Sequence, residues 1–422
     1  MGTWAMTGKG NPSSSAGRRL FLARGLAAGT LVLATPERQG GMLVPVWQPR
    51  HLAAAALVPG AAVSLADFSG RPGADRSVLA EAFRKGLAAL ARAGGGTLLV
   101  PPGTYDFGTF DQPESILLCR DLRDIVISAY GAVFVANTAR TVVPHMFYFY
   151  NFNNVTLAGA TFVDHGFSPW VDWQGMYCVG IQADRPSSGL RLVDCLAERV
   201  LGLLASNNDA AGRHLLSDIH VQGEVRHAYY GVGANYIGGR VSVDLDCHNV
   251  RRAFIAYAAR HADVVVRTSA TLTWPGSNGL VALVCPGARL GDVEHVRVRI
   301  DVSGDCIHGS YVHFYHQGPQ REGAMRDIDA TVNVLSRQAM ATMFLFDHET
   351  DGVQPQTARQ WDRISLHGSL APGSSGRMIA NPSVSTAIGT VYLDRNLALP
   401  AGPMPAGFQL ASEPSGNTPC DC

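Results

Sequence analysis

The sequence DIHVQGEVRH at 218–227 is followed, 22 residues further along, by RVSVDLDCHN at 240–249. Both segments alternate apolar and polar residues, as a β-strand does when one of its faces is buried. Similar segments recur at intervals of about 22 to 36 residues, the period of a parallel β-solenoid whose loops vary in length. They begin near Asp124, Asn154, Gly189, Asp218, Arg240, Asp263, His295, Asp327 and Arg363.

Each repeat also contains a second apolar segment of strand length, at 147–150, 231–234, 254–257, 281–284, 311–315 and 343–346. The residues between these segments lack helical periodicity, which argues against a βαβ fold, and the steady repetition argues against a β-sandwich. The sequence therefore predicts an all-β fold, a parallel β-solenoid over residues 63–398.

The segment at 63–107, VSLADFSGRPGADRSVLAEAFRKGLAALARAGGGTLLVPPGTYDF, resembles the opening of the pectate-lyase superfamily. Its apolar residues at 79, 83, 87 and 90 have helical spacing, and three glycines at 94–96 end the helix before a short strand. The resemblance implies a single-stranded, right-handed parallel β-helix with an N-terminal capping helix, and it implies activity on polysaccharides. The sequence departs from the family pattern at 72–75, which is usually more acidic.

The N-terminus resembles a twin-arginine export signal. Arg18 and Arg19 precede a mildly apolar run at 23–34, although Gly17 stands where that pattern usually has Ser or Thr. The run is shorter than the roughly 20 residues of a membrane-spanning helix. We expect a signal peptide at 1–36, a linker at 37–62 and a C-terminal tail at 399–422. The twin-arginine translocase would then be a partner during export, the mature protein would not bind the membrane, and its location would be periplasmic or extracellular.

The overall charge excludes some classes of partner. The 34 basic and 34 acidic residues cancel, so no global field favours nucleic acid or an anionic membrane. The eight cysteines show no paired metal-ligand spacing in the body of the chain, so no metal site is predicted. No cofactor is required by the sequence. Calcium stays possible, but no clear acidic cluster indicates it.

Equivalent positions on neighbouring repeats of a solenoid lie roughly 4.8 Å apart, so they form columns along which a sugar chain can bind. One such column precedes the second strand of each repeat. Tryptophan faces suit pyranose rings, and Arg or His can neutralise a uronate carboxylate. As substrate-binding residues it offers Trp170, Asp172, Trp173, Tyr229, Arg251, Trp274 and Asn278, extended by His313 and Tyr315.

The same column could support β-elimination, which needs a base, a group that neutralises the uronate carboxylate and an acid for the leaving oxygen. His227 and Tyr230 are the candidates for base and acid, Arg252 for the neutralising cation, and His308 for either proton transfer. The alternative is that the arginines are solvated and the aromatic residues cap turns.

A second column suggests hydrolysis. Aligning the two quoted segments places Glu224 opposite Asp246, with Asp301 two repeats further on. Carboxylates on adjacent strands would be near 5 Å apart, the separation of a retaining glycosidase. Polar residues on a solvated strand face give the same pattern. Three functions thus stay open: a polysaccharide lyase, slightly favoured, with an epimerase as its variant; a glycoside hydrolase; and a non-catalytic glycan-binding β-helix.

Overall fold

The computed structural model divides the chain into two compact units, 1–52 and 53–422. The residues it describes all lie in the second unit: 60–112, 115–139, 142–169, 174–209, 211–212, 214–269, 279–286, 291–304, 310–317, 323–336, 342–348, 361–371, 379–380, 389–394, 397 and 408–410. The predicted export signal at 1–36 and most of the predicted linker lie outside these residues. Among the described helices, none has both the length and the apolarity to span a membrane.

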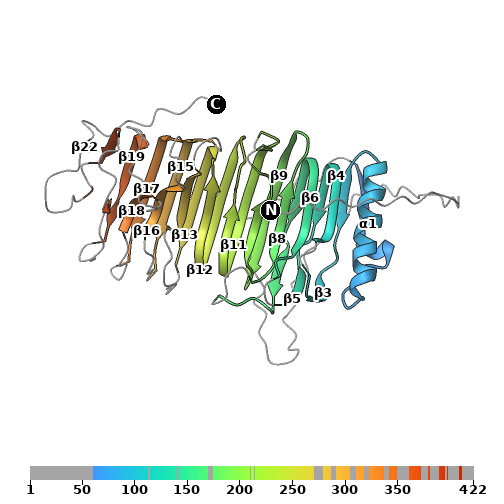
Figure 1. Ribbon diagram of the computed structural model, residues 1–422. Coiled ribbons are helices and arrows are strands. Elements are labelled where there is room, and N and C mark those ends of the chain that lie inside the picture. The colour runs from blue at the N-terminus through green and yellow to red at the C-terminus, as the bar shows by residue number, and fades with distance from the viewer. Residues whose placement is uncertain are drawn as a thin grey trace. The chain divides into compact units, whose positions relative to one another are not determined.

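The described part of the second unit opens with a strand, a short 3-10 helix and an α-helix. These are β1 (Ala61–Ser64), η1 (Leu65–Phe68) and α1 (Arg76–Arg92). The apolar face predicted for α1 is buried against the first strands, and it consists of Leu79, Phe83, Leu87 and Leu90. Figure 1 shows α1 at one end of the stacked strands, where it covers the edge of the solenoid.

The remaining elements are strands, and every pair among them is parallel. They are β2 (Gly96–Leu99), β3 (Gly103–Phe110), β4 (Ser115–Ser128), β5 (Ala132–Thr138), β6 (His145–Ala158), β7 (Thr161–Asp164), β8 (Tyr177–Gln182), β9 (Ser187–Glu198), β10 (Gly202–Ser206), β11 (Leu216–Gly233), β12 (Val241–Tyr257), β13 (Arg260–Thr268), β14 (Val281–Pro286), β15 (Val293–Val302), β16 (Ser310–Gln317), β17 (Met325–Val334), β18 (Thr342–His348), β19 (Trp361–Leu370), β20 (Ile379–Ala380), β21 (Val391–Leu393) and β22 (Phe408–Leu410).

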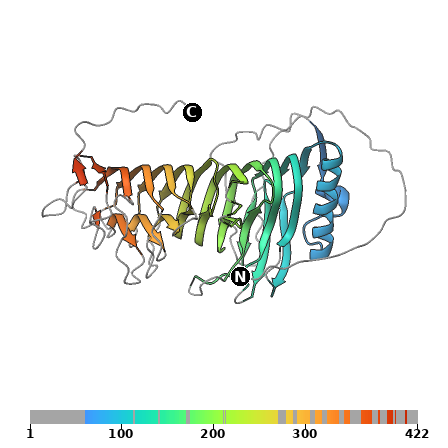
Figure 2. The ribbon, with the colours of Figure 1, turned by 45° about the horizontal axis from the view of Figure 1, so that its top comes forward.

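The pairing shows a chain that coils around one axis. The first half of β6 pairs with β8, whereas its second half pairs with β9, so one strand bends across two faces of the coil. Figures 1 and 2 show successive turns of this coil stacked side by side. The predicted parallel β-helix is confirmed.

The strands form faces that we name by their members. Face A contains 145–150 of β6, then β8, β10, 230–233 of β11, 252–257 of β12, β14, β16 and β18. Face B contains β1, β2, 125–128 of β4, 155–158 of β6, 190–193 of β9, 219–221 of β11, 241–243 of β12 and the first halves of β13, β15, β17 and β19. Face C contains β3, β5, β7, 223–226 of β11, 245–248 of β12 and the ends of β13, β15 and β17.

Most of the predicted repeat starts have a special backbone conformation. At seven of them φ lies between 50° and 74°, and each stands directly before a face B strand: residues 124, 154, 189, 218, 295, 327 and 363. Asn and Asp, which recur here, tolerate this left-handed conformation better than most residues. One start was misplaced: the residue equivalent to His295 is His261 (φ 53°), not Asp263, because Ala262 pairs with Val296.

Two predicted boundaries also need correction. The first strand, β1, begins at Ala61 rather than at residue 63, and its four residues pair with β2. At the other end, β22 lies within the predicted tail but pairs with β21. The solenoid therefore continues beyond residue 398.

The Asp164 side chain connects the segment before β8 to face C through hydrogen bonds. Its side chain is fully buried, and its Oδ1 accepts the backbone N–H groups of Thr138 and Gly166, both at 2.9 Å. Its Oδ2 accepts the backbone N–H of Met176 at 2.8 Å. A buried carboxylate with three such donors holds the chain before β8 in a fixed position.

We expect Asp164→Asn to lower the free energy of unfolding by about 2 kcal/mol, because the amide NH₂ cannot accept a hydrogen bond from a buried backbone donor. Denaturant unfolding measures this. The matched control is Asp106→Asn, where an exposed carboxylate accepts one backbone N–H, from Gly108 at 2.8 Å. The control should change stability by less than about 0.5 kcal/mol. Equal effects in the two variants would contradict the role given to Asp164.

Candidate functional site

The outer side of face A carries a column of rings that crosses several turns of the helix. His145 stacks on Tyr177 with ring centroids 5.6 Å apart, and Tyr177 stacks on Tyr230 at 6.4 Å. Arg252 follows Tyr230 in the strand register. We call these four residues the ring column.

Two glycines make room for these rings. A Cβ atom at Gly202, which lies between Tyr177 and Tyr230 in the register, would come within 2.6 Å of the Tyr177 ring. A Cβ atom at Gly180 would come within 2.4 Å of His145 and 2.6 Å of Tyr148. Rings from adjacent strands therefore lie over the backbone of both glycines.

We expect Gly202→Ala to lower the free energy of unfolding by about 1–3 kcal/mol, because the added methyl group must displace the stacked Tyr177 ring. The near-ultraviolet circular dichroism of the tyrosines should change as well. Gly233→Ala is the control, because a Cβ there meets no atom closer than 3.6 Å on the same face. The packing interpretation fails if both variants melt alike.

A hydrogen-bonded polar cluster surrounds the first ring of the column. The Nδ2 atom of Asn207 lies 3.2 Å from Nε2 of His145 and 3.3 Å from the Tyr148 hydroxyl. That hydroxyl donates to Oε1 of Gln182 at 2.6 Å. Because an amide nitrogen only donates, Nε2 of His145 acts as an acceptor in this arrangement. We call His145, Tyr148, Gln182 and Asn207 the polar cluster.

Burial changes the protonation of the polar cluster. It lowers the pKa of His145 to about 4, so the imidazole is neutral near pH 7. Burial also raises the pKa of Tyr148, against the opposing effect of its hydrogen bond with Asn207, so this phenol keeps its proton. A neutral imidazole beside a protonated phenol can accept one proton and donate another.

The predicted lyase residues are only partly brought together. Tyr230 and Arg252 are register partners on face A. Tyr230 is only 7% exposed, which leaves its hydroxyl little access to substrate. His227 is exposed at the corner between faces C and A, with φ 49°, and its Nδ1 lies 2.8 Å from Nδ2 of Asn249. His227 is therefore a corner residue, three positions before Tyr230.

The predicted binding residues on β11, β12 and β16 lie on the same face. The Arg251 guanidinium lies over the Tyr229 ring, 4.3 Å from its centroid. His313 is buried, and its Nε2 lies 3.3 Å from a carboxylate oxygen of Asp347 and its ring 5.1 Å from that of Tyr315. The other predicted site residues lie outside the described residues: Trp170, Asp172, Trp173, Trp274, Asn278 and His308.

The carboxylate pair lies on face C in the predicted register, with Glu224 opposite Asp246. Both carboxylates are in ion pairs. Glu224 accepts from Nε of Arg226 at 2.6 Å, and Asp246 accepts from Nε of Arg267 at 2.6 Å. Burial raises the pKa of Glu224, but its hydrogen bonds with His248 and Arg226 outweigh burial and lower it. A lowered pKa does not suit the general acid of a glycosidase.

Sequence reasoning did not assign His145, Tyr148, Tyr177 or Asn207 to this site. The sequence did contain one indication of His145 and Tyr148. The segment at 147–150 was predicted, like 231–234, as the second strand of its repeat, so these two residues belong to the same column as Tyr230. Asn207 had no such signal, because it follows β10 by one residue and meets His145 only across two turns of the helix. Within the described residues, no group of three or more His, Cys, Asp or Glu side chains could hold a metal ion.

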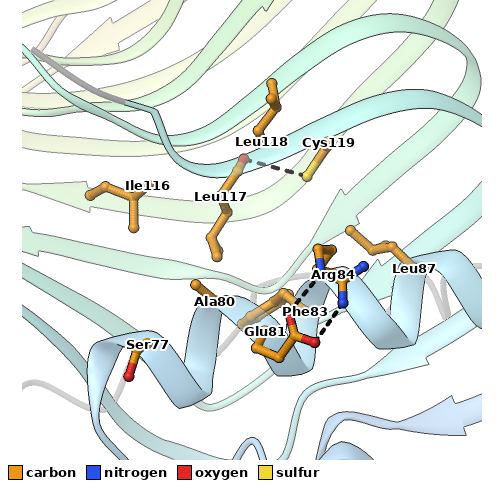
Figure 3. Close-up of a pocket in the computed structure, with 10 residues that line it drawn as sticks. All are labelled: Ser77, Ala80, Glu81, Phe83, Arg84, Leu87, Ile116, Leu117, Leu118 and Cys119. Carbon is orange, nitrogen blue, oxygen red and sulfur yellow. Dashed lines mark hydrogen bonds and ion pairs between the residues drawn. The ribbon is translucent and has the colours of Figure 1, made fainter. Parts of the chain in front are cut away.

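A hollow of about 280 Å³ lies between α1 and the first half of β4 (Figure 3). Ile116, Leu117 and Leu118 form its strand side. Glu81, on the helix side, is held by Arg84 in an ion pair of 2.5 Å. Burial raises the pKa of the Cys119 thiol to about 12, so this thiol stays protonated. The hollow is a packing gap beneath the capping helix rather than a set of reactive groups.

The chain resembles several solved structures at low sequence identity. One is an exopolygalacturonase of Thermotoga maritima, with a TM-score of 0.45 and 11% sequence identity. The match covers 80% of this chain and 87% of that chain. Another is the A-module of a mannuronan C-5 epimerase of Azotobacter vinelandii, with a TM-score of 0.43 and 15% sequence identity. The match covers 83% of this chain and 100% of that chain.

A third similar structure is a tailspike protein of E. coli bacteriophage HK620 in complex with a pentasaccharide (TM-score 0.46, 14% identity). The match covers 82% of this chain and 64% of that chain. No protein-family model matches the sequence, and no curated protein matches it significantly. At these identities the likeness concerns the fold, so the function must be argued from the side chains of this chain.

Proposed function

We propose that this protein cleaves a uronate-containing polysaccharide by β-elimination on the outer side of face A. The observation that carries the proposal is the polar cluster, in which a neutral imidazole and a protonated phenol lie side by side next to the ring column. The two rings of His145 and Tyr148 have centroids 5.1 Å apart. Both side chains are partly exposed, in contrast to Tyr230.

In this proposal His145 is the base and Tyr148 the acid. The imidazole takes the proton on the carbon next to the uronate carboxylate, the bond from the neighbouring carbon to the glycosidic oxygen breaks, and a carbon–carbon double bond forms. Tyr148 gives its proton to the leaving oxygen. Asn207 is exposed, and its amide N–H groups can turn from His145 to the substrate carboxylate and free Nε2.

Cations on either side of the polar cluster fit a polyanionic chain. Arg120 is exposed, and its guanidinium lies 4.5 Å from the centroid of the Tyr150 ring, on the same face as Tyr148. Arg252 is four strand spacings from His145 along the ring column, roughly 19 Å away. Arg120 is thus the cation that can neutralise the reacting uronate, and Arg252 binds a carboxylate several sugars along the chain.

The hydrolase alternative is less well supported. A retaining glycosidase needs one carboxyl group that keeps its proton, whereas hydrogen bonds lower the pKa of Glu224 and Arg267 pairs with Asp246. We also propose that the twin-arginine segment at 18–19 exports the protein, because an extracellular or periplasmic location would give it access to polysaccharides.

The test is to mix the purified protein with a panel of acidic and neutral polysaccharides. Ultraviolet absorbance of a conjugated double bond and the appearance of reducing ends should rise together, on acidic substrates only. Reducing ends without absorbance, with products heavier by one water, would instead establish hydrolysis. Binding without either signal would leave a glycan-binding β-helix and overturn the proposal of an enzyme.

A further inference from the structure

Face C carries a chain of hydrogen bonds that the proposed elimination does not use. Oε1 of Glu224 lies 3.2 Å from Nε2 of His248, and Nδ1 of the same histidine lies 2.9 Å from Oγ of Ser269. The three residues come from three successive turns of the helix: β11, β12 and the position directly after β13. Ser269 is in register with His248, whereas Glu224 lies diagonally, two positions before the register partner of His248.

The burial of these groups increases in the order that a nucleophile, its base and an orienting carboxylate require. Ser269 is exposed. The His248 side chain is 40% exposed, and that of Glu224 is 9% exposed. Arg226 donates to the same Glu224 oxygen at 2.6 Å, which fixes the carboxylate in place.

The hydrogen bonds also define the tautomer of His248. A carboxylate without a proton can only accept, so Nε2 of His248 carries the hydrogen that it shares with Glu224. In the neutral imidazole, Nδ1 is then the acceptor of the Ser269 hydroxyl proton. These are the roles of the histidine in a serine–histidine–carboxylate triad, which is recognised by geometry rather than by sequence order.

We propose that Ser269, His248 and Glu224 form a second active site, a carboxylic-ester hydrolase that removes acyl groups from hydroxyls of a polysaccharide. Ser269 is the nucleophile, His248 the general base and then acid, and Glu224 a positioning residue. This site is separate from the polar cluster of face A, and it does not depend on the elimination proposed there.

The reaction balances with water as the second substrate. Oγ of Ser269 bonds to the ester carbonyl carbon while Nδ1 of His248 takes the hydroxyl proton. The bond to the sugar oxygen then breaks, and that oxygen receives the proton from His248. Water attacks the acyl-serine in the same way, which releases the carboxylic acid and restores the Ser269 hydroxyl.

The surroundings favour an ester carried by a polymer. Ser269 and His248 lie on the outer side of a strand face, where a substituent that projects from a long chain can reach them. The neighbouring ladder is polar: Arg267 bridges Asp244 and Asp246 between the strands. Such a surface suits the hydroxyls of a glycan better than the tail of a lipid ester.

The test uses the whole protein with two probes, 4-nitrophenyl acetate and a fluorophosphonate that labels activated serines. We expect turnover of the acetate and a fluorophosphonate label on Ser269, identified by peptide mass. Ser269→Ala and His248→Ala should each lower both signals about 10³-fold. Glu224→Gln should lower kcat with KM unchanged, because the glutamine keeps the shape of the side chain but does not stabilise the imidazolium.

Ser303 provides a matched control. It is exposed, it is in register with Ser269 on the next turn, and its hydroxyl donates to the backbone carbonyl of Thr268 at 3.3 Å rather than to a histidine. Ser303→Ala should keep full activity and labelling. The proposal is overturned if Ser269 is not labelled in the wild type, or if wild type and Ser269→Ala turn over the acetate equally. Either result would mean that the three residues form surface hydrogen bonds without catalytic activity.

Discussion

Phe134→Ala should lower the free energy of unfolding by about 3–5 kcal/mol, the range for removing a buried phenyl ring from a rigid core. Phe134 is fully buried, and its ring packs against those of Phe147 at 5.2 Å, Phe162 at 5.5 Å and Tyr105 at 5.7 Å. It also lies 6.0 Å from Phe83 of the capping helix. The cavity would therefore loosen both the first turns of the solenoid and their cover.

Denaturant unfolding measures the loss, and hydrogen exchange locates it. Because each turn of a solenoid contacts only its neighbours, amides of β3 to β7 should lose protection more than those of β15 to β19. The control is Tyr392→Ala, which removes an aromatic ring that is 40% exposed on β21 and should change stability by less than about 0.5 kcal/mol. A uniform loss of protection along the chain would contradict a locally supported N-terminal core.

The second large effect concerns activity. His145→Gln should lower kcat for elimination by about 10²–10⁴-fold, the usual contribution of a general base. Glutamine can still hydrogen-bond to Asn207, so the fold should hold. His227→Gln is the matched control, because that histidine lies at an exposed corner and pairs with Asn249. If His227→Gln lost activity and His145→Gln did not, the base would be the residue predicted from the sequence.

The pH dependence gives an independent check on the same residue. A general base works only when it is unprotonated, and burial lowers the pKa of His145 from 6.5 to about 4. The elimination rate of the free enzyme should therefore stay high through pH 6 and fall only as the pH drops through about 4. An acid limb near pH 6.5 would point to a solvent-exposed histidine instead.

The period of the parallel β-helix is determined by the sequence. An apolar segment with alternating pattern recurs in each turn, and Asn, Asp, Gly or His stands at most of its starts, where the backbone takes a left-handed conformation. These are local properties, set by side-chain burial and by the φ angles that a residue tolerates. The opposition of Glu224 and Asp246 was predictable too, because the chain between them forms one short turn without a long insertion.

Only the tertiary structure decides which outer side chains meet across turns of different length. His145 and Asn207 are 62 residues apart, and the two turns of the helix between their strands have unequal lengths, so no fixed period aligns them. The connection of Glu224 to His248 and Ser269 is diagonal to the register, and it depends on how far each side chain reaches. Alternation along a strand shows which residues face outward, but contacts between outward side chains depend on loop lengths and rotamers that a sequence period does not encode.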